Sequence, residues 1–309
     1  RVQLVPWAPR AAPAPATRRR PATTSIQLAS GPSARMLSLH SALRPMRRLP
    51  HSESVTRNIA LMWKWFHQLA SPPHFYKISA ILAPWLAIPG LILIAYGAWQ
   101  GLFVVPMDYQ QGDAFRIIYV HVPSAYLSMM AYMIMATSGA IGLIWRIKLA
   151  HAVGAAAAPI GAAFTFLALC TGSIWGKPMW GTWWEWGDPR MMSELILLFL
   201  YFGYMALRSS IDDTTKADKA SAVLALVGIV NVVIVHFSVE WWSSLHQGQT
   251  VFKKGTMDAD MRIPLFIMLI GFTLLFGSML LRRIRTEVLY RERRTRWVRE
   301  MILSPKGGK

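Results

Sequence analysis

The chain has 309 residues, of which 54% are hydrophobic and only 16% are charged. Soluble domains average about 45–50% apolar and about 25% charged residues, so this composition favours a protein of the lipid bilayer over a soluble domain. The single cysteine, Cys170, excludes an internal disulfide framework, a CxxC thiol pair and a cysteine-rich zinc site.

The formal net charge of +18 is concentrated in two terminal segments. Residues 1–61 hold ten Lys and Arg against one acid, a net of +9, and residues 282–309 hold ten against three, a net of +7. Of the 33 basic and 15 acidic residues, 13 and 11 therefore remain for residues 62–281, a net of only +2. Basic tails around an apolar body are typical of cytoplasmic membrane flanks rather than of a nucleic-acid-binding face. We expect a membrane environment and no nucleic-acid partner.

The first 61 residues contain eight of the 19 prolines and no long apolar run. Such a segment cannot bury enough surface to offset the entropy of ordering it, so we expect a disordered or non-native N-terminal extension. Two interpretations fit it. One is a targeting leader rich in Arg and Ser, and the other is an upstream extension of a chain whose functional start is Met62.

From residue 62 on, six stretches with little or no charge recur at membrane length. A hydrocarbon core of about 30 Å needs about 20 apolar residues of helix. The shortest stretch contains Glu194, and we keep it because without it the Lys and Arg residues no longer alternate between loops. The sequence thus predicts an all-α, polytopic membrane domain over residues 62–281 with six transmembrane helices. The predicted spans are Ser79–Gly101, Ile117–Trp145, Leu149–Gly176, Met191–Leu207, Ala220–Val239 and Ile263–Leu281.

The loops between these spans differ in charge, which predicts their side of the membrane. Loops 146–151 and 208–219 hold two and three Lys or Arg, and the basic tail 282–309 holds ten. Loop 102–116 holds one Arg and two Asp, loop 176–190 holds two basic and two acidic residues, and loop 240–262 holds three of each, spread over more residues. Cytoplasmic loops carry the excess of Lys and Arg, so both termini are predicted to be cytoplasmic and these three loops to face outward.

The outer loop 176–190 and the end of the preceding span are unusually rich in tryptophan. Five of the 14 tryptophans fall within twelve residues, whereas simple interfacial anchoring accounts for one or two. A cluster of large rigid rings can form a platform for a flat apolar ligand or for a partner protein. The five are Trp175, Trp180, Trp183, Trp184 and Trp186.

Two histidines are predicted at the same outer face as this loop. His121 begins the second span, and His246 lies in the third outer loop. A six-coordinate haem iron takes one imidazole above and one below its plane and needs apolar walls, which this face supplies. Zinc is the alternative, if Glu185, Asp188 or Glu240 converge on the histidines. His236 would lie about 15 Å from His246 along a continuous helix, so we interpret it as structural unless the helix breaks between them.

The charged residues of the outer loop do not form a catalytic pair. Arg190 could bind a propionate, a phosphate or a partner carboxylate, and the alternative is a surface ion pair with Asp188. The sequence has no Walker A loop, no GxGxxG motif after a strand and no HExxH motif, which excludes an ATPase, a dinucleotide enzyme and a zinc protease. We do not expect an enzyme.

Several separated motifs resemble those of the haem exporter C family of cytochrome c maturation, within the group of haem-handling proteins that carry a tryptophan-rich "WWD" signature. The resemblance runs from about Met62 to the C-terminus. One departure is Gly187, which stands between Trp186 and Asp188 where the family has Trp directly before Asp. The matching stretches are Asp108–Gly112, Arg116–Pro123, Trp175–Trp184, Ser193–Tyr201, His236–Trp242 and Leu245–Gly248.

The resemblance implies a protein of the bacterial inner membrane that holds non-covalent haem b at the periplasmic face. It implies His121 and His246 as the axial ligands of the haem iron, and Asp188 and Arg190 as residues that engage a partner. The implied partners are a periplasmic haem chaperone (cytochrome c maturation protein E), the subunits of an ABC transporter and a small single-span subunit. The tryptophans implied to meet the haem are Trp180, Trp183, Trp184 and Trp186.

Two other classes of function remain open from the sequence. A b-type cytochrome subunit of a membrane redox complex would need histidine pairs inside the spans. A membrane scaffold without haem would use the tryptophan-rich loop only to dock a partner. A redox titration that shows a second haem near the cytoplasmic side would favour the cytochrome, and a spectrum without haem, with partner binding intact, would favour the scaffold.

Overall fold

The computed structural model describes residues 71–248 and 257–303, which fold into helices joined by short connections. Six of these helices are long and apolar enough to cross a membrane, and the described residues contain no β-strand. The predicted all-α class and the six spans are thereby confirmed for this part of the chain. The extension predicted over residues 1–61 lies outside the described residues.

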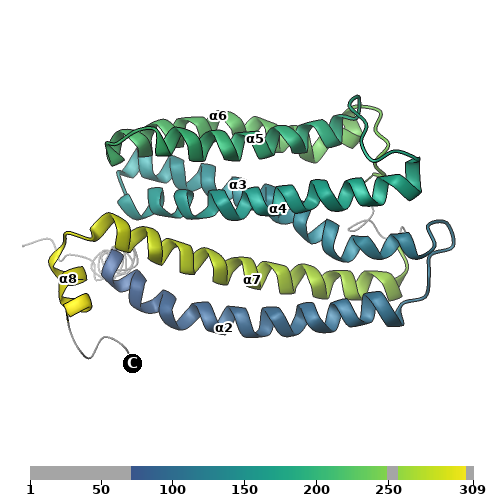
Figure 1. The fold of residues 1–309 in the computed structure, drawn as a ribbon, viewed down its shortest axis with the longest axis horizontal. Coiled ribbons are helices and arrows are strands. Elements are labelled where there is room, and N and C mark those ends of the chain that lie inside the picture. The colour runs from purple at the N-terminus through teal and green to yellow at the C-terminus, as the bar shows by residue number, and fades with distance from the viewer. Residues whose placement is uncertain (1–70, 249–256, 304–309) are drawn as a thin grey trace, which may run out of the picture. The chain divides into compact units, whose positions relative to one another are not determined.

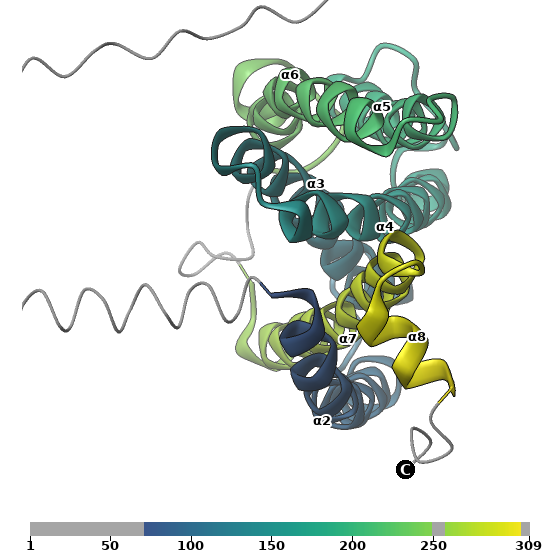
Figure 2. The same cartoon turned by 90° about the vertical axis from the view of Figure 1, so that its left-hand side faces the viewer.

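The six long helices pack as three pairs. α2 (Pro72–Trp99) lies along α7 (Ala259–Glu292), and α3 (Ile118–Trp145) lies along α4 (Lys148–Trp180). The third pair is α5 (Pro189–Ser209) with α6 (Thr214–Trp241). The α3–α4 pair lies between the other two pairs, as Figures 1 and 2 show in two perpendicular views.

Three short helical segments complete the described part. A π-helical turn, η1 (Gln100–Val104), continues α2, and a 3₁₀ turn, η2 (Asp113–Ile117), leads into α3. The short α8 (Arg296–Leu303) follows α7 and is joined to its end by the Trp297 indole, which donates a hydrogen bond to Glu292.

Two helices extend by four residues or more beyond the predicted C-terminal ends of their spans. α4 continues past Gly176 to Trp180, and Gly181 in the left-handed region (φ +78°) ends it, so the tryptophan-rich connection is shorter than predicted. α7 continues past Leu281 to Glu292 because Ile284 and Val288, one turn apart, are buried in a cluster with alanines of α4. Much of the predicted basic tail is therefore helix.

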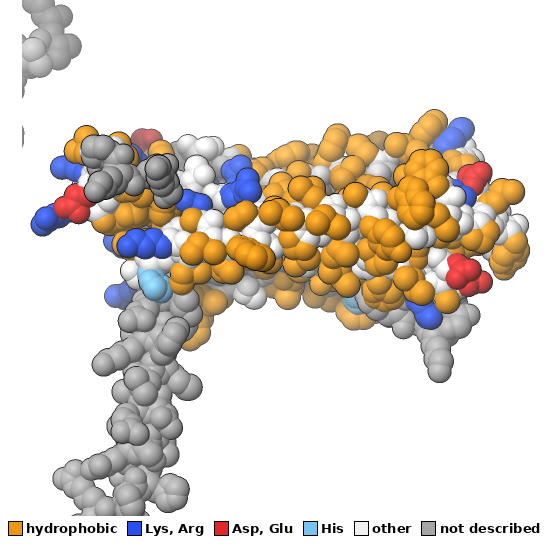
Figure 3. Space-filling view, turned by 90° about the horizontal axis from the view of Figure 1, so that it is seen from below, with side chains coloured by type: hydrophobic (Ala, Val, Ile, Leu, Met, Phe, Trp, Pro, Cys, Tyr) orange, Lys and Arg blue, Asp and Glu red, His pale blue; other side chains and the backbone are white. Residues whose placement is uncertain are grey.

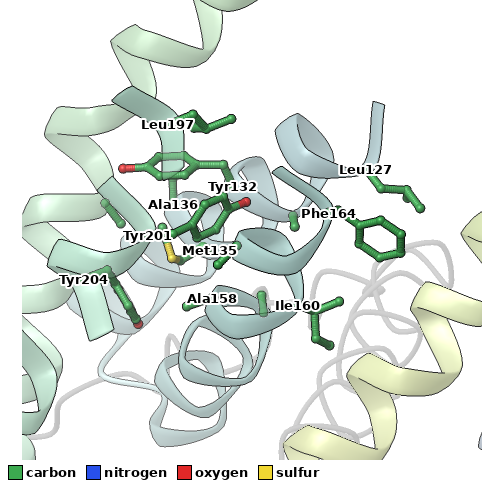
Figure 4. Packing of buried hydrophobic residues seen from close by; sticks show 14 of the residues in the cluster. Leu127, Tyr132, Met135, Ala136, Ala158, Ile160, Phe164, Leu197, Tyr201 and Tyr204 are labelled. Atoms are coloured by element: carbon green, nitrogen blue, oxygen red, sulfur yellow. The ribbon is translucent and has the colours of Figure 1, made fainter. Parts of the chain in front are cut away.

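The main core joins α3, α4 and α5 around two buried tyrosines. The rings of Tyr132 and Tyr201 meet edge to face with centroids 5.2 Å apart, and the Tyr201 hydroxyl donates to the carbonyl of Ser128 at 2.7 Å. Aliphatic side chains and alanines fill the space around them, as Figure 4 shows. This core fixes the relative positions of the three helices that lead to the site described below.

The outer surface of the bundle suits a lipid environment. Over α2 and α7 it is covered by hydrophobic side chains, with charged side chains gathered at its two ends (Figure 3). Trp85 on α2 is 73% exposed and Ile88 61%, which is unfavourable in water and ordinary in hydrocarbon.

One end of the bundle is held by a closed network of ion pairs. It lies where α5 and α7 end and α6 begins, and we call it the ion-pair end. Arg208 and Arg291 each contact Asp218, at 2.5 and 2.8 Å, and both also contact Glu287. The network ties three helices together with each carboxylate shared between two guanidinium groups.

Candidate functional site

The opposite end of the bundle brings His121 and His246 together, and we call it the histidine end. His121 lies in the first turn of α3. α6 ends at Trp241, and the segment that follows turns back so that the two imidazole rings lie 6.2 Å apart, centroid to centroid, with a tilt of 36°. The helix thus ends between His236 and His246, and the two residues do not lie on one continuous helix.

Hydrogen bonds assign the same protonation to both rings. Nδ1 of His121 lies 3.0 Å from Oγ1 of Thr171, whose own proton is directed to backbone carbonyls of α4, so Nδ1 is the donor. Nδ1 of His246 lies 2.7 Å from the carbonyl oxygen of Gln247, which can only accept. In a neutral imidazole with a proton on Nδ1, Nε2 carries the lone pair that binds a metal.

Burial supports the neutral form of His246. Desolvation lowers the pKa of the His246 imidazole below its ordinary value, and the positive charge of Arg190 lowers it further. The carbonyl of Gln247 and the charge of Asp188 oppose these effects. A lowered pKa keeps the ring uncharged, which is the form required of a metal ligand.

The position of His121 depends on a glycine. A Cβ atom at Gly172 of α4 would lie 3.1 Å from Cε1 of His121, closer than side chains normally pack. Gly172 therefore leaves the space that the imidazole occupies between α3 and α4.

Two tryptophans border the histidines. Trp175, which is only 5% exposed, meets His121 edge to face at 5.7 Å, and its indole donates to the side chain of Gln111. Trp180, at the end of α4, lies 6.4 Å from His246. Of these two residues, only Trp180 was among the tryptophans predicted to meet the haem. Thr171 and Trp175 are spaced i, i+4 on one helix, and this spacing places both on the face towards His121.

The other predicted tryptophans lie in the short connection between α4 and α5. Trp184 and Trp186 contact each other edge to face at 5.7 Å. Trp183 is 56% exposed and Trp186 72%, so their rings face away from the protein interior. The predicted set thus divides into Trp180 beside the histidines, the partly buried Trp184, and the outward-facing Trp183 and Trp186.

Asp188 and Arg190 hold this end together. Asp188 is 3% exposed and caps α5 through the N–H groups of Arg190 and Met191. Its second oxygen accepts hydrogen bonds from the Ser244 hydroxyl and the Leu245 N–H, which fixes the segment that carries His246. Arg190 donates to the carbonyl of Val235 on α6 at 2.6 Å. The partner-binding role predicted for both residues stays a prediction, and the structure adds this positioning role.

Gly187, the residue that departs from the family pattern expected from the sequence, lies in a tight turn. The N–H of Asp188 donates to the carbonyl of Glu185, and the N–H of Gly187 donates to the Glu185 side chain. The turn leads directly into the helix cap, where Asp188 starts α5.

A groove of about 640 Å³ opens beside the histidines between α3 and α6. Its walls are mostly apolar, with three methionines from α3 and valines from α6, and ligand-binding clefts of about 300–1,000 Å³ are the usual size for small molecules. Its polar side chains include His121, His236, His246 and Arg190. His236, for which we predicted a structural role, therefore lines the same groove.

The residues present fit haem better than a metal ion held by protein ligands alone. Within the described ranges, no three His, Cys, Asp or Glu side chains are arranged to hold a metal ion. Haem supplies four donors from its own ring and needs only axial ligands from the protein. An imidazole nitrogen lies about 2 Å from a bound metal, so two axial imidazoles on one iron have ring centres about 6 Å apart. The observed 6.2 Å agrees with this value.

Comparison with known proteins gives one consistent result. The family described as "Heme exporter protein C" matches residues 65–299. The chain is 51% identical over 242 residues to heme exporter protein C of Escherichia coli K12, covering 78% of this chain and 98% of that protein. Proteins of the same name from Haemophilus influenzae (46% identical, 78% and 98% covered) and Bradyrhizobium diazoefficiens (48%, 74% and 86%) are also similar.

Proposed function

Because the chain belongs to the haem exporter protein C family, we propose that it binds haem at the histidine end for delivery in cytochrome c maturation. The observation that carries the proposal is the pair of imidazoles 6.2 Å apart, each with Nδ1 engaged and Nε2 left for iron, beside an apolar groove. His121 and His246 are the axial ligands of a non-covalently bound haem b. The iron and its porphyrin are the cargo, and the protein holds, orients and releases them without a covalent step.

The porphyrin lies against Trp180 and the apolar side chains of the groove, which bind its flat face. A haem also carries two propionates. Arg190 lines the groove with a guanidinium that has donors beyond the one used on Val235, and it can pair with one of them. The two anchors together orient the haem by its iron and by its acidic edge.

The exposed tryptophans serve the step after haem binding, which is the transfer of haem to a partner protein. Trp183 and Trp186 expose large aromatic surface next to the proposed haem site, and exposed aromatic rings are typical anchors of protein interfaces. We assign them to contact with a periplasmic haem chaperone, cytochrome c maturation protein E, which takes the haem. Subunits of an ABC transporter and a small single-span subunit complete the proposed assembly.

The proposed location is the bacterial inner membrane, with the histidine end on the periplasmic face and both termini in the cytoplasm. Loop 146–151, with two Lys or Arg and no acid, and the basic tail 282–309, with a net charge of +7, support this orientation. A membrane-impermeant thiol reagent should label Trp183→Cys in intact spheroplasts and Lys216→Cys only after the membrane is permeabilised. The reverse pattern would contradict the orientation.

Haem binding itself is tested by absorption spectroscopy of the full chain purified in detergent, oxidised in air and then reduced with dithionite. His121→Ala and His246→Ala should each remove most of the haem absorbance because one axial ligand is lost. His74→Ala is the matched control, since this exposed histidine lies at the start of α2, away from the site. Full absorbance in both site variants would overturn the ligand assignment.

Chaperone contact is tested by transfer. Trp183→Ala and Trp186→Ala should retain haem absorbance and slow haem transfer to the chaperone, because the rings face outward. Unchanged transfer in the double variant would remove the interface assignment while leaving haem binding in place.

A further inference from the structure

Glu194 is a buried carboxylate that the proposed haem binding does not use. It lies on α5 and is 6% exposed. One of its oxygens, Oε1, accepts a hydrogen bond from the Ser128 hydroxyl of α3 at 2.7 Å. The other oxygen, Oε2, is buried and has no hydrogen-bond partner among the described residues. An ionisable group inside a membrane domain is costly, so its presence calls for a functional explanation.

Glu194 lies next to the histidines. It lines a small cavity of about 50 Å³ together with His121, His246 and Arg190. A water molecule needs about 10–15 Å³ of such space, so the cavity admits a few waters between the carboxylate and the imidazoles. Glu194 therefore lines the same cavity as the two histidines proposed to hold the iron.

Burial disfavours the charged form of Glu194, and two neighbouring groups oppose that cost. Arg190, whose guanidinium stays protonated in proteins, precedes it by one turn of α5. Ser128 donates a hydrogen bond to it, which stabilises a carboxylate. The other titratable groups near it are Tyr201 on the same helix, whose hydroxyl is directed to the Ser128 carbonyl, and Asp188, whose oxygens are used at the helix cap.

We propose that Glu194 is the counter-charge of the bound iron and favours oxidised over reduced haem. The proposal rests on the proposed function, because it requires iron between His121 and His246. Oxidised haem with two neutral imidazoles carries one more positive charge than reduced haem. Reduction adds one electron from an external reductant and neither forms nor breaks a bond. The positive charge of the bound iron joins Arg190 and Ser128 in favouring the carboxylate, and the carboxylate in turn stabilises the oxidised state, which has the extra positive charge.

The test is a redox titration of the haem in the full chain, with dithionite as reductant and haem absorbance as readout. Two charges within about 10 Å at an effective dielectric constant of about 20 change an equilibrium by about tenfold. Glu194→Gln should therefore lower the oxidised-to-reduced ratio at a fixed potential by about tenfold, which equals a rise of about 59 mV in midpoint potential for one electron. A merely structural role would not move this potential.

Three further variants make the test specific. Glu194→Leu also removes the charge, and it leaves the Ser128 hydroxyl its bond to the Ala125 carbonyl. It should raise the potential like Glu194→Gln. Glu194→Asp keeps the charge and should stay within threefold of the wild-type ratio. Glu185→Gln is the matched control, because this neighbouring glutamate is exposed and its charge is screened by solvent.

The outcomes separate the two proposals. A wild-type chain without haem would overturn the proposed function. Haem bound in both charge-removing variants at an unchanged potential would overturn only the role of Glu194. If Glu194→Gln and Glu194→Leu fail to accumulate, with or without Glu194→Asp, the carboxylate is needed for folding and the counter-charge proposal is likewise overturned.

Discussion

The two ends of the helix bundle use polar residues in opposite ways. At the ion-pair end, two arginines and two carboxylates satisfy one another across three helices. At the histidine end, two imidazoles present unused nitrogens, and Glu194 and Trp184 each have a buried polar atom without a hydrogen-bond partner in the described part of the chain. A groove and a small cavity lie among these groups.

This difference assigns stability mainly to the ion-pair end and ligand binding to the histidine end. In a closed network every charged group already has a partner, so the network binds no ligand and serves to hold the helices together. Unsatisfied groups around a cavity weaken the fold unless a ligand meets them, and this is typical of binding sites. Substitutions at the ion-pair end should therefore lower the stability of the fold, and substitutions at the histidine end should weaken haem binding.

The largest loss of stability is expected at the ion-pair end. Asp218→Ala leaves Arg208 and Arg291 without their shared carboxylate, and breaking a buried ion pair on one side costs about 3–5 kcal/mol. The variant should unfold at a clearly lower temperature or denaturant concentration in detergent. The fraction that remains folded should keep its haem absorbance, since this network lies at the other end. Selective loss of haem without loss of stability would contradict the division.

Asp188→Ala should affect both properties, because Asp188 is a structural residue within the histidine end. It removes the cap of α5 and the two bonds that fix the segment carrying His246. Loss of a helix cap costs about 1 kcal/mol. We expect that loss in unfolding experiments together with at least tenfold weaker haem retention, measured by haem absorbance after dialysis. Haem retention equal to that of the wild type would show that the segment is held by other contacts.

The fold followed from the sequence because hydrophobic length and charge distribution determine membrane helices directly. The weakest predicted span, Met191–Leu207, was correct, since α5 runs from Pro189 to Ser209. The errors came at helix ends. The predicted third span ended at Gly176, yet α4 continues through Gly176 and Pro178 until Gly181 adopts a positive φ. Tertiary contacts, here those of Ile284 and Val288, likewise extended α7 beyond the apolar stretch.

Less of the candidate site than of the fold could be predicted from the sequence. His121 and His246 were identified by residue type and predicted face, and the resemblance to a family agreed. The residues that hold these two imidazoles in place were not predicted in that role, because hydrogen bonds between distant segments leave no local pattern in the sequence. Thr171, Gly172 and Trp175 act through one face of α4, and helical spacing alone could have suggested them.

A smaller effect is expected at Gly172. Adding a methyl group there places it 3.1 Å from the ring of His121, so the imidazole must move by a few tenths of an ångström. Gly172→Ala should weaken haem retention several-fold with little change in stability, because alanine also favours the helix by up to about 1 kcal/mol. Gly203→Ala is the matched control, since its nearest neighbour would be 3.8 Å away. Equal haem retention in both variants would show that the ring has room to adjust.

The smallest effect should come from the helix cap near the ion-pair end. Asp213 caps α6 by accepting from the N–H groups of Thr215 and Lys216, and these bonds hold the pKa of its carboxyl below the ordinary value. A lowered pKa means that the carboxylate contributes stability above its ordinary pKa and loses it as the pH falls through the lowered one. Unlike Asp188, Asp213 is exposed and accepts no hydrogen bond from another segment of the described chain. Asp213→Ala should therefore cause a slight decrease in melting temperature at neutral pH, none in strong acid, and no change in haem absorbance. Weaker haem binding in this variant would mean that the two ends are coupled through α6, which also carries His236 into the groove.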